Sequence, residues 1–211
     1  MSKMFLQMLS GSLVSIEIFV LTLIFAIPLG FLVAKGRMSK NKIISAIVNF
    51  YIMVMRGTPL ILQLLFFYFA PYYIFGFSWG RFTAVIVAFT INYAAYFAEI
   101  YRGGIQSIDK GQYEASSVLG YTKAYSFFHI ILPQVIKRIM PAMANEIITL
   151  VKDTALAQTI GVAELFRVAQ TTSSRVFSTM PIFFAGVFYF VMNGVLSKLF
   201  DSVERKLAYY E

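Results

Sequence analysis

Long uncharged apolar runs, separated by short clusters of charged residues, are the dominant pattern of this chain. A helix that crosses a bilayer core about 30 Å thick needs roughly 20 apolar residues. Five stretches meet this requirement, and we expect each to form a membrane-spanning helix. They are residues 11–34, 43–80, 82–98, 139–162 and 176–197. The second stretch is long enough for a full span followed by an apolar segment on the outer side.

Composition supports a membrane protein and excludes several other classes. Hydrophobic residues make up 59% of the 211 residues and charged residues 13%, whereas an ordinary soluble domain has roughly 45–50% and about 25%. The absence of cysteine excludes disulfides, thiolate metal sites and cysteine nucleophiles, and the single histidine, His129, leaves almost no material for a metal centre. The net charge of +8 comes from short basic clusters between the apolar runs, so we expect no nucleic-acid partner.

The basic clusters also predict an orientation. Five spans place the two termini on opposite sides, and cytoplasmic loops carry an excess of Lys and Arg. With the N-terminus outside and the C-terminus inside, twelve of the 18 Lys and Arg residues lie on the cytoplasmic side and four lie outside, with Arg56 and Lys152 in the membrane. We therefore expect a multi-pass membrane protein with this orientation.

One cytoplasmic loop, residues 102–138, is much longer than the others. Asp109 and Gln112 have the spacing of a capping box, which predicts a helix over 112–119 that stops at Gly120. A second amphipathic piece over 123–131 is expected to end at Pro133. A long ordered loop in so small a membrane protein is typical of a docking surface.

The same loop reads Glu114-Ala115-Ser116, three residues, Gly120, nine residues, and Ile130-x-Leu132-Pro133. This pattern resembles the EAA loop of ABC-importer permeases. That motif has E-A-A, three residues, G, nine residues and I-x-L-P. Every defined position matches except one, where serine replaces the usual second alanine. The matching residues are Glu114, Ala115, Ser116, Gly120, Ile130, Leu132 and Pro133.

Flanking segments resemble the polar amino-acid branch of that family, the permeases of the histidine and glutamine type. They are residues 56–59 (Arg-Gly-Thr-Pro), 98–105, 145–146 (Asn-Glu) and 152–154 (Lys-Asp-Thr). The resemblance implies an all-α, type I importer permease in a bacterial inner membrane, with residues 1–211 forming one transmembrane domain.

The resemblance also implies partners. These are two ABC ATPase subunits docked on the EAA loop, a second permease chain (a copy or a paralogue), an external amino-acid-binding protein and an amino-acid substrate. No G-x-x-x-x-G-K-[ST] phosphate loop occurs in the sequence. We therefore expect no enzymatic activity and no cofactor in this chain, with ATP and Mg used by the partner ATPase.

A candidate substrate site follows from the second apolar run. Thr58 suits an N-cap and Pro59 the first position of a helix, so a new half-helix is expected to begin at the middle of the membrane. Its free N–H groups, next to Gly57 and Thr58, would hold an anion such as an α-carboxylate.

Two other polar residues are candidates for the ammonium group of the substrate. Glu146 offers a carboxylate and Asn92 an uncharged amide. Each has a structural alternative: Glu146 can form a buried ion pair with Arg56 or Lys152, and Asn92 can form an interhelical hydrogen bond.

Two other functions are considered. An ATP-independent secondary transporter or channel for small polar solutes would need no ATPase, and the long loop would then be incidental. A membrane-embedded enzyme would need clustered acids or a His/Arg constellation at the membrane surface, and Asp109 and Glu114 stand apart from other acids.

Overall fold

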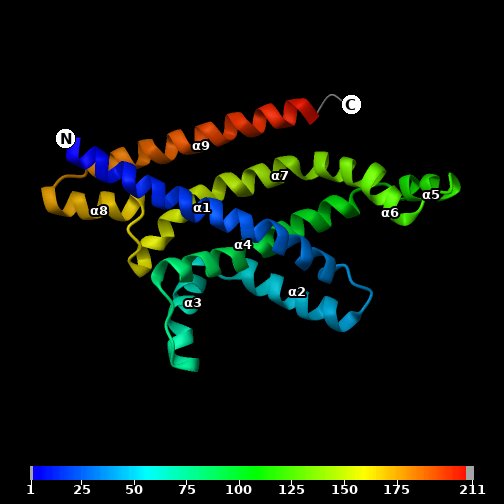
Figure 1. Cartoon of the computed structure of the whole chain (residues 1–211), viewed down its shortest axis with the longest axis horizontal. Helices are drawn as coiled ribbons and strands as arrows, with labels where there is room; N and C mark the ends of the chain where they lie inside the picture. The colour runs from blue at the N-terminus through cyan, green and yellow to red at the C-terminus, as the bar shows by residue number, and fades with distance from the viewer. Residues whose placement is uncertain (1, 208–211) are drawn as a thin grey trace.

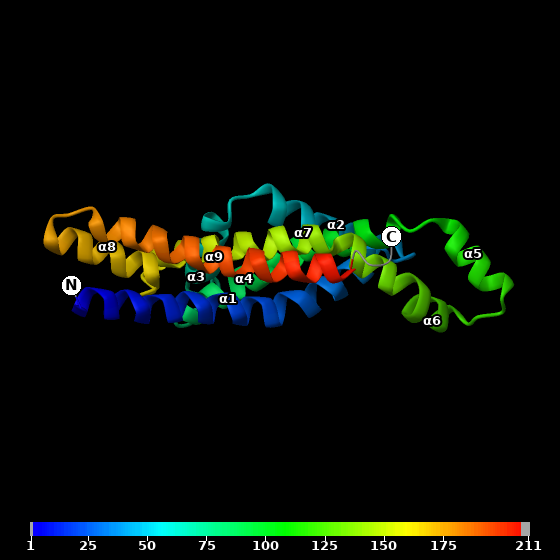
Figure 2. The same cartoon turned by 90° about the horizontal axis from the view of Figure 1, so that it is seen from above.

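The structure, a computed structural model, describes residues 2–207, and all regular elements in that part of the chain are helices. The long helices lie side by side in an elongated bundle (Figures 1 and 2). The helices are α1 (Ser2–Arg37), α2 (Lys42–Gly57), α3 (Leu60–Phe75), α4 (Arg81–Gln106), α5 (Lys110–Val118), α6 (Lys123–Ser126), α7 (Leu132–Asp153), α8 (Leu165–Val176) and α9 (Met180–Leu207). A π-helical segment, η1 (Phe127–Ile131), joins α6 to α7, and a 3-10 segment, η2 (Thr154–Ile160), follows α7.

The directions of the long helices agree with alternating spans. Helices α1, α4 and α9 run the same way along the long axis, and α7 runs the opposite way (Figure 1). Within residues 2–207, α1, α4 and α9 are long and apolar enough to cross a membrane, and the bent pair α2–α3 is a fourth candidate. Helix α7 carries Glu146, Lys152 and Asp153. The all-helical class is confirmed, whereas the count of five spans and the orientation stay predictions.

The second apolar run is broken in the middle. Helix α2 ends at Gly57, α3 begins at Leu60, and the two axes differ by 111°. In Figure 1, α3 points across the long axis of the bundle. The turn divides the run into two helices of 16 residues each, as the expectation of a half-helix beginning near Pro59 implied. That the run holds one full span followed by an outer segment stays a prediction, because the bent pair counts as one candidate span.

Helix boundaries also differ from those of the apolar runs. Helix α4 continues past Ala98 to Gln106. Helix α9 begins at Met180 rather than at Val176, because Val176 is the last residue of α8, a helix that the sequence did not predict. A run of uncharged residues marks the length of chain that lipid can contact, and a helix continues beyond it with charged residues in water.

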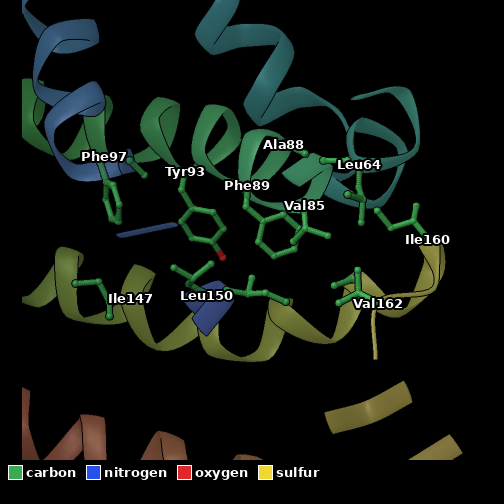
Figure 3. Packing of buried hydrophobic residues seen from close by; sticks show 14 residues of the cluster. Leu64, Val85, Ala88, Phe89, Tyr93, Phe97, Ile147, Leu150, Ile160 and Val162 are labelled. Carbon is green, nitrogen blue, oxygen red and sulfur yellow. The ribbon is translucent and has the colours of Figure 1, made fainter. Parts of the chain in front are cut away.

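Helix α4 lies at the centre of the bundle. Figure 3 shows Phe89, Tyr93 and Phe97 of α4 directed toward α7, where Ile147 and Leu150 lie. On its other side α4 meets α1, where Gly30 lies so close to Phe97 that a Cβ at that position would come within 2.8 Å of the Phe97 Cβ. Small residues at helix interfaces permit this approach inside a membrane.

The predicted turn at Gly120 is present. Asp109 caps α5 by accepting a 2.6 Å hydrogen bond from the N–H of Gly111. Gly120 has a φ of +75°, its N–H donates to the carbonyl of Ser117, and Tyr121 donates to the carbonyl of Ser116. This is the Schellman arrangement that glycine favours after a helix.

The sequence predicted that the second helical piece of the loop would end at Pro133, but it continues past this residue. Helix α6, η1 and α7 form one continuous helical stretch from Lys123 to Asp153. In η1 the N–H of Leu132 donates to the carbonyl of Phe127, five residues earlier. This wider turn accommodates Pro133, which has no N–H to donate.

Candidate substrate site and coupling surface

The break between α2 and α3 exposes backbone inside an apolar run. Residues 56–59 are all exposed. Within the described residues, the N–H groups of Leu60 and Ile61 donate no hydrogen bond. These unpaired donors at the beginning of α3 are the groups that would attract an anion.

The role expected of Thr58 as an N-cap is wrong. Its hydroxyl donates to the carbonyl of Val54 at 2.8 Å, so it closes the last turn of α2 instead of capping α3. Pro59 takes the N-cap position, without a side-chain cap. The N–H groups of α3 therefore remain available, although for a different reason from the one expected.

Gln63 holds the break together, and no role for it followed from the sequence. This side chain is buried, and its amide nitrogen donates to the carbonyl of Met55 (2.9 Å) and to the carbonyl and hydroxyl of Thr58 (3.1 and 2.8 Å). It thereby satisfies carbonyls that the end of α2 leaves unpaired.

Asn92 belongs to the same network. It is buried, and its amide nitrogen donates to the carbonyl of Met55 at 3.1 Å and to the Gln63 Oε1 at 2.9 Å. These bonds join α4 to the break, as the interhelical alternative expected. A contact between Asn92 and the substrate stays a prediction.

Glu146 forms no ion pair with Arg56 or Lys152 in the described part of the chain. Arg56 instead lies 3.7 Å from the carboxylate of Glu99 and over the ring of Tyr96, 5.3 Å from its centre. Glu146 is half-buried on α7.

Asp153 is engaged in a way that the sequence did not predict. It accepts a 2.7 Å hydrogen bond from the hydroxyl of Tyr93, which joins the end of α7 to α4. Lys152 is exposed and forms no ion pair in the residues that the structure describes. Glu146 and Asp153 lie seven positions apart on α7, and therefore on one face of that helix.

The EAA motif divides into outward-facing and inward-facing residues. Glu114, Ala115 and Gly120 are exposed, whereas Ser116 is buried and donates its hydroxyl to the carbonyl of Gln112 at 2.6 Å. A small residue is therefore required at position 116. In the second half of the motif Pro133 is exposed, and Ile130 and Leu132 are half-buried.

Two apolar side chains at the tip of the loop had not been singled out. Val118 is 87% exposed and Leu119 68% exposed. They adjoin the Gly120 turn at the end of α5, where the loop projects beyond the bundle (Figure 2). Exposed apolar groups of this kind, next to polar Glu114, are typical of a surface that binds a partner.

A bundle of apolar helices, a break with free backbone donors and a projecting loop define a helical membrane transport protein. Comparison with known proteins identifies its family. Residues 26–209 match the family described as the inner membrane component of binding-protein-dependent transport systems, and the chain belongs to that family.

Relatives extend over almost the whole chain. It is 38% identical over 200 residues to the arginine transport system permease protein ArtQ of Bacillus subtilis (strain 168), with 94% of this chain and 91% of the relative covered. It is 36% identical over 203 residues to a putative glutamine transport system permease protein of Rickettsia felis, with 96% and 93% covered.

A solved structure, described as a crystal structure of an amino acid ABC transporter with histidines, is similar throughout. The TM-score is 0.90 and the identity 38%, with 98% of this chain and 96% of that chain covered. The type I ABC permease fold expected from the EAA motif is confirmed. The chain is a permease subunit of an ABC importer, and an ATP-independent transporter or channel is not favoured.

Proposed function

We propose that this chain, as a single domain over residues 1–211, forms half of the pore of an importer for an amino acid in a bacterial inner membrane. Separate ATPase subunits hydrolyse ATP with Mg and drive alternating access, and an external solute-binding protein delivers the substrate. The family and the relatives named for arginine and glutamine transport support this proposal. A second permease chain, a copy or a paralogue, completes the pore.

The break at residues 57–59 is the observation that carries the proposal. Free backbone N–H groups cannot face lipid, because each unpaired group costs several kcal/mol there. Irregular backbone within an apolar run is tolerated where it lines a polar cavity. The exposed segment with Gly57 and Thr58 therefore fits a substrate pathway, and the start of α3 fits a carboxylate.

Glu146 supplies the opposite charge. It lies on the same face of α7 as Asp153, and this helix also contains the exposed residues Asn145 and Lys152. Charged side chains inside membrane proteins face a water-filled pathway or another chain rather than lipid. This polar face of α7 supports a pathway between two permease chains, with Glu146 directed to the ammonium group of the substrate.

Asn92 assists this site through the break. Its amide positions Gln63 and the carbonyl of Met55, so it holds the beginning of α3 in place. We expect it to act on the substrate chiefly through this positioning, and Asn92→Ala to weaken uptake less than loss of the Glu146 charge.

Energy reaches the site from the loop. The continuous helical stretch from Lys123 to Asp153 connects the loop that contains Glu114 and Gly120 with the face that contains Glu146. Its 31 residues span about 45 Å at 1.5 Å per residue. A partner that moves the docking loop can thus move the substrate site directly.

Uptake by the reconstituted permease–ATPase complex tests the proposal. Proteoliposomes are supplied with ATP inside and with binding protein loaded with labelled arginine or glutamine outside. Glu146→Gln removes a charge-assisted hydrogen bond worth about 1.5–3 kcal/mol, so uptake at limiting substrate should fall roughly ten- to a hundredfold. Glu17→Gln is the matched control, because Glu17 is an exposed carboxylate on α1.

Thermal stability separates a substrate role from a structural one. Since Arg56 is paired with Glu99, Glu146→Gln should leave no arginine without a partner and should keep the melting temperature of the complex. A destabilised Glu146→Gln that Arg56→Met rescues would contradict the substrate assignment. Uptake that continues without ATPase subunits would contradict the importer itself.

A further inference from the structure

Three arginines surround one carboxylate where α1, α2 and α4 meet. Arg37 Nε and Arg56 Nη1 lie 3.8 and 3.7 Å from oxygens of Glu99, and Arg102 Nη2 lies 2.7 Å from it. The four side chains together carry a net charge of +2. No other carboxylate forms an ion pair in the described residues.

Only Arg102 binds this carboxylate through hydrogen bonds. Its Nε lies 3.0 and 3.1 Å from the two Glu99 oxygens, and its Nη2 lies 2.7 Å from one of them. The contacts of Arg37 and Arg56 are too long for hydrogen bonds. In the part of the chain that the structure describes, the guanidiniums of Arg37 and Arg56 donate no hydrogen bond, and the Nε of Arg37 is buried without an acceptor.

The cluster lies at the level where the apolar part of α1 ends. Ala34, the last residue of the first apolar run, packs with Ala98, which precedes Glu99. The turn from α1 to α2 follows, with Lys40 and Lys42 exposed. This turn lies at the same end of the bundle as α5 and α6 (Figure 1). At the ends of the apolar runs of α1 and α4, arginines extend their charged ends toward lipid headgroups.

The side chains of Arg37 and Arg56, whose guanidiniums donate no hydrogen bond in the described residues, are partly exposed. The side chain of Arg56 is 44% exposed and that of Arg37 29%. Stacking over Tyr96 fixes the position of the Arg56 guanidinium. Unused donors held in fixed positions at a membrane surface match an anion that presents several acceptor oxygens.

We propose that Arg37 and Arg56 bind the phosphate group of an anionic phospholipid, with Glu99 and Arg102 positioning the two guanidiniums. Phosphate accepts paired hydrogen bonds from arginine. Basic pockets between membrane helices bind anionic headgroups in this way. The exposed lysines of the α1–α2 turn add attraction for a negatively charged lipid surface. The bound lipid links the end of α1 to the end of α2.

Lipid retention measures this site in the assembled permease–ATPase complex. The complex is reconstituted in nanodiscs of phosphatidylcholine and phosphatidylglycerol, extracted in mild detergent, and its bound lipids are counted by native mass spectrometry. Wild type should retain phosphatidylglycerol in preference to phosphatidylcholine. In the double variant Arg37→Gln/Arg56→Gln, the amount of retained phosphatidylglycerol should fall by roughly tenfold or more.

Arg205→Gln is the matched control for a basic residue at the same end of the bundle. Arg205 is exposed, and its Nε donates to the carbonyl of Asp201 on its own helix. This control should retain lipid as wild type does. Equal retention by the double variant and the control would overturn the proposal.

The lipid preference of the wild-type complex and its affinity for inorganic phosphate test the same proposal. A wild-type complex without any preference for phosphatidylglycerol overturns it, whatever the variants do. In nanodiscs of phosphatidylcholine alone, calorimetric titration with inorganic phosphate shows whether free phosphate occupies the site. Saturable binding of free phosphate that the double variant abolishes, together with unchanged phosphatidylglycerol retention, would assign the site to free phosphate and refute the lipid.

Discussion

Replacement of Gly120 tests the coupling loop most directly. At a φ of +75° an L-residue costs about 1–2 kcal/mol. A Cβ at this position would meet no atom within 4 Å, so steric overlap adds nothing to that cost. Gly120→Val should therefore disfavour the turn by this amount or somewhat more, because valine is β-branched. A penalty of one to two kcal/mol lowers the population of the native turn roughly 5- to 30-fold relative to alternatives.

The assay is the ATPase activity of the reconstituted complex with and without substrate-loaded binding protein. Gly120→Val should lose most of the stimulation by substrate, while the permease still inserts into the membrane. Gly120→Asn is the matched control, since asparagine adopts left-handed conformations more readily than valine, and it should keep most of the stimulation. Normal stimulation of the valine variant would refute the reasoning. Equal losses in both variants would point to contact of the Cβ with the partner instead of to backbone conformation.

Three further predictions concern topology and stability. A cysteine introduced at exposed Ser174 should react with an impermeant thiol reagent in right-side-out vesicles and one at exposed Ser117 should not; the reverse pattern would contradict the orientation. Glu164 is fully buried and accepts two 2.7 Å hydrogen bonds from N–H groups that begin α8, so Glu164→Gln should destabilise by about 1–3 kcal/mol, seen as a lower melting temperature in detergent. A Cβ at Gly104 would overlap the Cγ2 of Ile139; Gly104→Ala should cost about 1–3 kcal/mol, and Ile139→Leu, which removes the Cγ2 branch at similar volume, should restore part of it in the same melting experiment.

Features that depend on neighbouring residues were predictable from the sequence. The turn at Gly120 follows from local chemistry, because glycine alone enters the left-handed region freely after a helix. The position of the break at Thr58–Pro59 followed from the same kind of signal. Its angle did not, since it depends on bonds from Gln63 and from Asn92, a residue of another helix.

Charge pairing was the least predictable part of the site. The structural alternative for Glu146 was an ion pair with Arg56 or Lys152, but Arg56 lies beside Glu99. Arg37 and Arg56 approach the same carboxylate from different helices, and both are more than forty positions away from it in the chain. Such pairs are determined by helix packing, which the order of residues along one apolar run does not specify.

The π-helical turn at Phe127–Ile131 also sets an angular phase. Each residue of an α-helix rotates the chain by about 100° and advances it by 1.5 Å. Deletion of one residue in this segment would turn every side chain of α7, Glu146 included, by roughly that angle relative to the docking loop. Substitutions in the segment leave this phase unchanged. We therefore expect the chain to tolerate changes of residue type there much better than changes of length.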